Sequence, residues 1–236
     1  MTYSILLFDL DDTLLDFGKK ETESLTDLFQ HYGYTYSDDV LQHYKSVNKQ
    51  LWTDYENGSI PLDVVLNTRF SATLSRLGQD VDGLEWENRY RDLLGGGTHI
   101  LIDGAMEVCQ RLSVTHRLFV ITNGITRTQI NRLQLTGLHD YFEAIFDSQR
   151  IGHQKPSTAF FDYVRHHIPG FEREKALVIG DSLHTDIKGG LQSGIDTCWF
   201  NRTSQLNPPS IPSTYTISNL SELIGICGSG SGSGDY

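Results

Sequence analysis

The chain has 236 residues, of which 38% are hydrophobic and 21% charged, and its formal net charge is −11 at pH 7. This length allows one large domain or a core with a small second domain, and the composition is typical of a soluble globular protein. The acidic balance argues against binding to a nucleic-acid backbone, and neither a membrane-spanning stretch nor a signal peptide is visible. Three widely spaced cysteines fit neither a disulfide framework nor a metal site, so we expect a cytoplasmic protein.

The first predicted element is a short strand over residues 5–8. Four consecutive apolar residues indicate a strand that is buried on both faces, as in a parallel sheet. Asp9 and Asp11 follow, and a spacing of two places both carboxylates on the same side of an extended chain end. Close carboxylates repel unless a cation lies between them or one takes a proton. Either outcome would indicate a functional site. Taken alone, the aspartates, with Asp12 before Thr13, are equally compatible with a turn or a helix cap.

Residues 18–94 have the spacing of helices throughout. Apolar residues recur every three or four positions in four segments, which are separated by turn residues at Gly33, Asn57-Gly58 and Gly78. The fourth segment ends at Gly95-Gly96-Gly97, a predicted flexible return and candidate hinge. These features predict a small four-helix bundle, inserted after the first strand.

From Asp103 onward, predicted strands and helices alternate. This alternation predicts an α/β fold with a doubly wound parallel sheet, in which the last strand lies at an edge. The Rossmann-like core is expected to comprise residues 1–17 and 96–227, with a helical cap at 18–95. Residues 228–236 are nearly all Gly and Ser and are predicted to be an appended flexible segment. The predicted strands are 118–121, 144–146, 176–179, 195–199 and 214–217, and the predicted helices begin at 103–104 or cover 126–135, 157–166 and 185–192.

Polar residues follow the predicted core strands. Thr122 and Asn123 come directly after one strand, and Asp181 comes just after another, with Asp186 one helical turn later. Lys155 lies just before a predicted helix. Because ligands bind at the carboxyl ends of the strands in open α/β sheets, we expect these side chains to gather there with the first aspartates.

This set of groups suits phosphoryl transfer. Carboxylate oxygens, a backbone carbonyl and water are ligands for Mg²⁺, and the sequence offers no His/Cys set of the zinc type. Thr122, Asn123 and Lys155 supply donors for the oxygens of a phosphoryl group. One aspartate can attack phosphorus, and a second carboxyl can protonate the leaving oxygen and later deprotonate water.

The same residues resemble the four ordered motifs of the haloacid dehalogenase superfamily. The motifs are Asp9-Leu10-Asp11-Asp12-Thr13-Leu14, Thr122-Asn123, Lys155-Pro156 and Gly180-Asp181-Ser182-Leu183-His184-Thr185-Asp186, and the resemblance covers the whole chain before the Gly-Ser segment. It implies that Asp9 is the nucleophile and Asp11 the acid/base. It further implies that Thr122 and Lys155 bind the substrate phosphate, to which we expect Asn123 to contribute as a further donor.

The resemblance also implies a metal site and a cap. Mg²⁺ would be held by Asp9, Asp11 (through its backbone carbonyl) and Asp181, with Asp186 a ligand or a support. A helical insertion directly after the first motif resembles the superfamily's first cap class, which closes over small substrates.

One position separates the activities within this superfamily. The haloacid dehalogenases lack an acid two residues after the nucleophile because a leaving halide needs no proton, whereas this chain has Asp11 there. A phosphatase is therefore expected. Short segments of the sequence also resemble the YjjG/YfnB-type pyrimidine 5′-nucleotidases, for example Leu14-Leu15-Asp16-Phe17 and Gly194-Ile195-Asp196-Thr197-Cys198-Trp199.

Other activities stay open at this point. A phosphatase for another small ester, such as phosphoglycolate or a sugar phosphate, is the main alternative. A 2-haloacid dehalogenase and a non-catalytic, receiver-like binding domain are remote ones. We expect a small phosphorylated substrate, with a nucleoside monophosphate favoured, no nucleic-acid polymer or membrane as partner, and a monomer or homodimer.

Overall fold

The computed structural model describes residues 3–203 and 211–228. The chain divides into two compact units, one formed by Met1–Phe17 with His99–Tyr236 and the other by Gly18–Thr98. The larger unit resumes at His99, and its Ile100 carbonyl accepts a hydrogen bond from the Asp16 backbone N–H at 2.9 Å. The predicted Gly-Ser segment lies outside the described residues, except for Gly228.

The larger unit is built on a six-stranded sheet in which all neighbouring strands are parallel. The strand order is β3-β2-β1-β4-β5-β6, with the last strand at an edge as predicted. The central strand is buried along its whole length, which explains why its sequence is continuously apolar rather than alternating. The strands are β1 (Ile5–Phe8), β2 (Arg117–Thr122), β3 (Ala144–Asp147), β4 (Ala176–Gly180), β5 (Asp196–Phe200) and β6 (Tyr215–Ile217).

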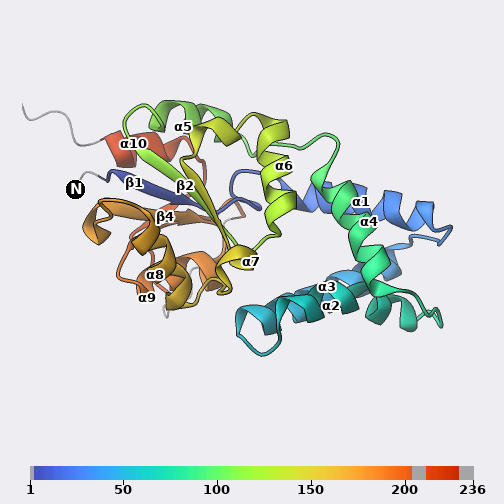
Figure 1. The fold of residues 1–236 in the computed structure, drawn as a ribbon. Coiled ribbons are helices and arrows are strands. Elements are labelled where there is room, and N and C mark those ends of the chain that lie inside the picture. Colours follow the sequence, from blue (N-terminus) through green and yellow to red (C-terminus); the bar gives the residue numbers. More distant parts are fainter. Residues whose placement is uncertain (1–2, 204–210, 229–236) are drawn as a thin grey trace, which may run out of the picture. The chain divides into compact units, whose positions relative to one another are not determined.

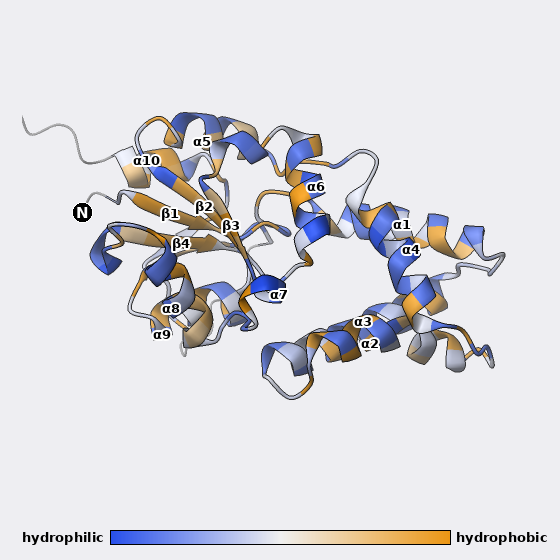
Figure 2. Ribbon diagram, in the orientation of Figure 1, coloured by the Kyte–Doolittle hydropathy of each residue, from blue (hydrophilic) through white to orange (hydrophobic). Residues whose placement is uncertain are grey.

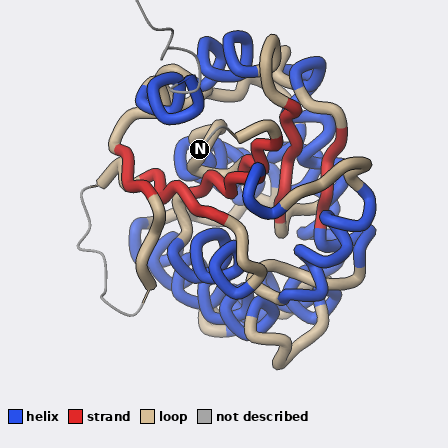
Figure 3. The backbone as a smooth tube through the Cα atoms, turned by 90° about the vertical axis from the view of Figure 1, so that its left-hand side faces the viewer, coloured by secondary structure: helices blue, strands red, loops and turns tan. Residues whose placement is uncertain are grey.

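Helices cover both faces of this sheet (Figures 1 and 3). One hydrophobic cluster joins Leu6 and Phe8 to α5, α6 and α10, and the other joins Ile5 and Leu7 to α8. Figure 2 shows the strands as an apolar layer between helices of mixed hydropathy. The helices of this unit are α5 (Ala105–Leu112), α6 (Thr126–Thr136), α7 (Ser148–Ile151), α8 (Thr158–His167), α9 (Lys188–Gln192) and α10 (Glu222–Gly228), with 3-10 turns at His139–Tyr141 and Arg173–Lys175 and a π-helical turn at Leu183–Ile187.

The strand order places a topological switch point beside β1. The chain moves outward from β1 through β2 to β3 and then returns to β4 on the other side of β1. In open α/β sheets, ligands bind outside the carboxyl ends of the strands at such a point. Asp9 follows β1 and Asp181 follows β4, so both aspartates emerge at the switch point.

The smaller unit consists of four helices, as the spacing of its apolar residues predicts. Its core is aromatic, and Tyr44, Phe70, Trp86 and Tyr90 are buried in it. In the part of the chain that the structure describes, every helix is too short or too polar to cross a membrane. The helices are α1 (Phe17–His31), α2 (Asp38–Glu56), α3 (Leu62–Ser75) and α4 (Gly83–Gly95).

The two ends of the inserted segment meet in the larger unit. Leu15 and Leu101 form an isolated antiparallel bridge. The Ile102 backbone N–H donates to the Leu14 carbonyl, and the Asp16 backbone N–H donates to the Ile100 carbonyl, both at 2.9 Å. The chain therefore leaves and re-enters this unit at adjacent points.

Three short elements differ from the sequence prediction. The helices α7 and α10 were not predicted, since each spans seven residues or fewer and offers little periodicity. The helix predicted over 185–192 starts earlier, at Leu183, and its first turn is π-helical. That wider turn buries Asp186 completely beneath the end of β4.

Candidate active site

Lys155 lies between two aspartates at the carboxyl edge of the sheet. Its ammonium donates to Asp9 Oδ1 at 2.7 Å, to Asp186 Oδ1 at 2.6 Å and to the Ile121 carbonyl at 2.9 Å. All three side chains are buried. Three acceptors match the three N–H groups of the ammonium, so Lys155 is held rigidly between the ends of β1 and β4.

Asp186 approaches the backbone of β4 closely because residue 180 has no side chain. A Cβ atom on Gly180 would lie 2.2 Å from Asp186 Oδ2 and 2.3 Å from its Cγ, closer than atoms can approach. The same Oδ2 accepts a hydrogen bond from the Ser182 backbone N–H at 3.1 Å. Gly180 is therefore required for the position of this carboxylate.

Thr13 joins the first motif to the last. Its hydroxyl donates to Asp9 Oδ2 at 3.1 Å and lies 3.4 Å from Asp181 Oδ1. The backbone N–H of Asp181 donates to the Thr13 oxygen at 3.1 Å, and the carbonyl of Asp181 accepts from the Trp199 indole at 2.9 Å. The two aspartates at the switch point are thus fixed relative to each other by one hydroxyl.

Three carboxylates in this cluster are placed to hold a cation. Asp9, Asp181 and Asp186 each offer an oxygen, and these three oxygens lie within 4.8 Å of one another. A set of hard oxygen ligands with no nitrogen or sulfur suits Mg²⁺. The Asp11 carboxylate is not in this set; the ligand that the sequence resemblance implies at Asp11 is the backbone carbonyl.

The electrostatics of the site also favour a cation. Burial raises the pKa of Asp9 to about 7, with the charges of Asp186 and Asp11 adding to the effect and Lys155 opposing it. Burial, together with Asp9 and Asp186, raises the pKa of Asp181 well above its usual range. Burial lowers the pKa of Lys155, but its two carboxylate partners outweigh burial and raise it, so the ammonium stays charged. One ammonium does not balance the negative charge of three carboxylates, whereas an added divalent cation would.

The second predicted motif contributes a hydroxyl and an amide with different partners. Thr122 Oγ1 accepts from the Gly124 backbone N–H and from the Gln129 side chain, both at 3.0 Å, which leaves its hydrogen for another acceptor. Asn123 faces the backbone of Lys155, donating to its carbonyl at 3.0 Å and accepting from its N–H at 2.9 Å. Both polar atoms of the Asn123 amide are therefore used in holding Lys155.

Asp11 is held by two side chains that lie outside the predicted motifs. Gln129 donates to Asp11 Oδ2 at 2.7 Å, and the Arg132 guanidinium forms an ion pair with Asp11 Oδ1. Both donors lie on α6 and are buried. The sequence contains one relevant signal, two polar residues three apart on the same face as buried Leu133, but a solvated helix face produces the same pattern.

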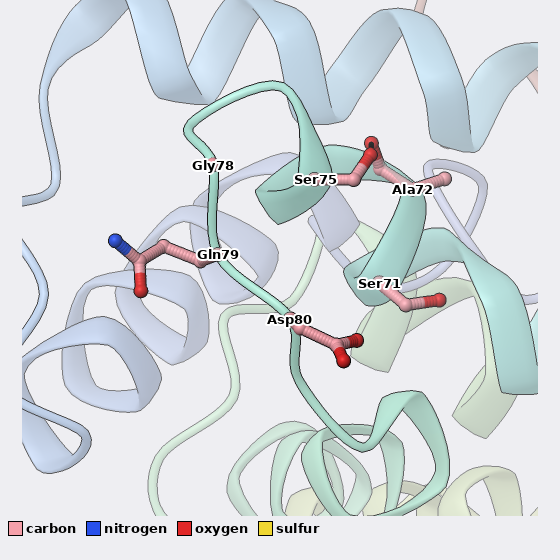
Figure 4. A pocket seen from close by; sticks show the side chains of 6 residues that line it. All are labelled: Ser71, Ala72, Ser75, Gly78, Gln79 and Asp80. Carbon is pink, nitrogen blue, oxygen red and sulfur yellow. Dashed lines mark hydrogen bonds between the residues drawn. The ribbon is translucent and has the colours of Figure 1, made fainter.

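The described hollows in the smaller unit contain none of the predicted site residues. One hollow of about 440 Å³ lies between the end of α3 and the loop that follows it, and Figure 4 shows the residues that line it, Ser71, Ala72, Ser75, Gly78, Gln79 and Asp80. Another, of about 680 Å³, lies beside α2 and α3 and includes His43 and Arg76. Because the predicted site residues lie elsewhere, the candidate active site is the aspartate cluster of the larger unit.

Comparison with known proteins gives a family match over most of the chain. The model of the haloacid dehalogenase-like hydrolase family matches residues 6–200. YfnB of Bacillus subtilis, named as a HAD-hydrolase, is 44% identical over 221 residues, which are 94% of this chain and 94% of that protein. A magnesium-bound crystal structure of YfnB has a TM-score of 0.92 at 42% identity and covers 97% of this chain and 100% of that chain.

Two pyrimidine 5′-nucleotidases are also similar to this chain. PynA of Streptococcus pneumoniae is 38% identical over 230 residues, covering 95% of this chain and 94% of that protein. YjjG of Escherichia coli is 32% identical over 225 residues, covering 94% and 97%. In each case the similarity extends over both units of the chain.

Proposed function

Because this chain belongs to the haloacid dehalogenase-like hydrolase family, we propose that it is a magnesium-dependent phosphatase of pyrimidine nucleoside 5′-monophosphates. The observation that carries the proposal is the cluster at the switch point. Asp9, Asp181 and Asp186 offer oxygens to one cation, Lys155 contacts two of them, and Asp11 follows the proposed nucleophile by two residues. This set combines a nucleophile, an acid/base and positive charge for a phosphoryl group.

In the first step, an Asp9 carboxylate oxygen attacks phosphorus while the bond from phosphorus to the ester oxygen breaks. The departing alkoxide takes a proton from the Asp11 carboxyl and leaves as the nucleoside. The Thr122 hydroxyl donates a hydrogen bond to a phosphoryl oxygen, and the Lys155 ammonium, whose three N–H groups contact Asp9, Asp186 and the Ile121 carbonyl, supplies positive charge beside it. Mg²⁺, when bound, neutralises negative charge shared by the carboxylates and the phosphoryl group.

In the second step, water attacks phosphorus in the aspartyl phosphate. Asp11 accepts the proton of that water, the bond from phosphorus to the Asp9 oxygen breaks, and inorganic phosphate leaves. Asp9 returns as a carboxylate and Asp11 as a carboxyl, so both groups are ready for another cycle. A halide leaving group would need no such proton, so Asp11 supports ester hydrolysis over dehalogenation.

The proposed substrate class rests on the relatives. PynA and YjjG are pyrimidine 5′-nucleotidases and are similar to this chain over at least 94% of its length. The chemistry of the core is common to many phosphate esters, so selectivity must come from residues that contact the nucleoside. We therefore expect UMP, dUMP and dTMP to be hydrolysed with higher kcat/KM than hexose phosphates or phosphoglycolate.

Phosphate release from that panel, with Mg²⁺ and with EDTA, tests the proposal. We expect near-zero activity in EDTA and recovery on addition of Mg²⁺, because the acidic site repels a phosphate dianion without a cation. Full activity in chelator would contradict the metal-dependent mechanism. A clear preference for a sugar phosphate would contradict the nucleotidase assignment and leave the phosphatase assignment intact.

A further inference from the structure

We propose that Gln129 and Arg132 are positioning residues that orient the Asp11 carboxyl for its proton transfers, an inference that rests on the proposed phosphatase function. Nothing in the predicted motifs includes these two residues. They come from one face of α6 and reach Asp11 across more than a hundred residues of sequence.

The first argument is the geometry of the contacts. Gln129 Nε2 donates to one Asp11 oxygen at 2.7 Å, and Arg132 Nη1 donates to the other. Arg132 Nη1 also donates to Gln129 Oε1 at 2.8 Å, so the two donors are tied to each other. With each oxygen engaged by a different donor, rotation of the Asp11 carboxyl about its Cβ–Cγ bond is restricted.

The second argument is the burial of the guanidinium. Arg132 is 1% exposed and packs 5.7 Å from the centre of the Phe17 ring. Among the described residues, Asp11 is the one carboxylate within ion-pair distance of Arg132. A buried ion pair is often no more stabilising than apolar side chains of similar volume. Stability alone therefore does not explain an arginine here, whereas fixing the direction of Asp11 does.

The third argument is that Gln129 couples Asp11 to the second motif. The same Nε2 that donates to Asp11 also donates to Thr122 Oγ1 at 3.0 Å. Gly124 makes room for this arrangement, since a Cβ there would lie 2.0 Å from Gln129 Nε2. Asp11, the proposed acid/base, and Thr122, the proposed phosphoryl-binding hydroxyl, therefore both accept a hydrogen bond from Gln129.

These contacts predict a specific kinetic defect. When Asp11 loses its orientation, both of its proton transfers slow, while the nucleophile and the cation site are untouched. We expect Gln129→Ala and Arg132→Met to lower kcat for UMP by roughly 10–100-fold, less than the roughly 10²–10⁴-fold effect of losing general acid–base catalysis altogether. Arg132→Lys keeps one donor and should restore part of the loss.

An aryl ester separates the two chemical steps. p-Nitrophenolate leaves p-nitrophenyl phosphate with little protonation, so phosphorylation of Asp9 by this ester should be nearly normal in Arg132→Met, whereas attack by water stays slow. Phosphoenzyme on Asp9 should accumulate above the wild-type level in acid-quenched samples. A variant that is merely less stable would lose both steps together and would show no accumulation.

A double-mutant cycle with Asp11→Asn completes the test. If Arg132 acts through Asp11, Arg132→Met, which leaves the contact between Gln129 and Thr122 in place, should change kcat by less than about threefold once Asp11 is replaced. The matched control is Gln134→Ala, an exposed glutamine on the same helix, which should leave kcat unchanged. Thermal melts of each variant show whether it is folded at the assay temperature.

The outcomes distinguish this inference from the proposed function. An active wild-type enzyme whose variants keep kcat, gain kcat, or lose it equally in the Asp11→Asn background would overturn the positioning role alone. A folded wild-type chain with no phosphatase activity towards either ester would overturn both.

Discussion

Buried charge lies in both units of the chain, and its balance is opposite in the two. In the smaller unit, Glu87 contacts two arginines, a bidentate Arg69 at 2.6–2.7 Å and Arg91 at 2.5 Å. In the larger unit, Lys155 contacts two aspartates, and a third carboxylate lies beside them. One cluster has an excess of cationic groups around one acid, and the other has an excess of acids around one cation.

The pKa values follow that balance. Burial alone would raise the pKa of Glu87, but Arg69 and Arg91 outweigh burial and lower it. Burial raises the pKa of Asp9 to about 7, and its single ammonium partner does not reverse this. A compensated acid stabilises the fold, whereas an uncompensated one stores unfavourable energy until a ligand arrives. The contrast favours the aspartate cluster as the candidate functional site, without reference to motifs.

The largest expected effect comes from Asp9→Asn. Turnover of UMP should fall by roughly 10⁴-fold or more because the nucleophile is lost. The melting temperature in EDTA at neutral pH should be unchanged or higher, because the substitution removes an unfavourably buried carboxylate. Phosphate-release assays and thermal melts measure the two quantities. Substantial remaining turnover, or a clear loss of stability, would break the contrast between the clusters.

Glu87→Gln should have the opposite signature. It leaves two arginines beside a neutral side chain and should lower the free energy of unfolding by about 3–5 kcal/mol. Urea denaturation measures this loss. Glu107→Gln is the control, since its i,i+4 pair with Arg111 is exposed and should contribute only about 0.3–0.5 kcal/mol. Equal losses of unfolding free energy for the two substitutions would show that the buried cluster stabilises the fold no more than an exposed ion pair does.

The pH dependence of stability should also differ from that of an ordinary protein. Between pH about 4 and about 7, Asp9 binds a proton in the folded state but not in the unfolded state, because its folded pKa is the higher one. Stability in EDTA should therefore fall as pH rises through this window, by on the order of 4 kcal/mol, since each pH unit contributes about 1.4 kcal/mol. Mg²⁺ should remove the fall. Denaturation series at several pH values, with and without Mg²⁺, check this, and a stability that rises with pH in EDTA would contradict it.

The smallest expected effect concerns Trp199→Phe. This change removes the indole donor to the Asp181 carbonyl and should cost about 1 kcal/mol of folding free energy. It should also weaken the apparent affinity for Mg²⁺, because the position of Asp181 is less well held. A Mg²⁺ titration of activity measures the affinity. An unchanged midpoint would show that Thr13 alone suffices to hold Asp181.

Much of this arrangement could be predicted because it is local in sequence. An apolar run followed by acids specifies a buried strand and a charged sheet edge, which is why the parallel fold and the haloacid dehalogenase family assignment are confirmed. The roles of the individual site residues stay predictions, although Asp9, Lys155, Asp181 and Asp186 do lie together.

What could not be predicted depends on tertiary contacts. Gln129 and Arg132 are polar residues on a helix, and only the fold reveals that they face a carboxylate 118 and 121 positions away. Asn123 was placed correctly at the end of β2, yet its amide faces the Lys155 backbone, which no pattern in either segment indicates. Partner choice for a polar side chain is a property of the assembled fold.

The bridge between Leu15 and Leu101 has a consequence for how such a protein can be rebuilt. Because the chain exits and re-enters the larger unit at neighbouring backbone positions, the 18–98 segment can be excised and replaced by a short loop without stretching the polypeptide. Two backbone hydrogen bonds join the chain where it leaves and re-enters the larger unit, one between Leu14 and Ile102 and one between Asp16 and Ile100. All four residues belong to the larger unit. The larger unit therefore keeps these backbone contacts when the inserted segment is exchanged, so the 18–98 segment can vary while the proposed site residues of the larger unit keep their positions.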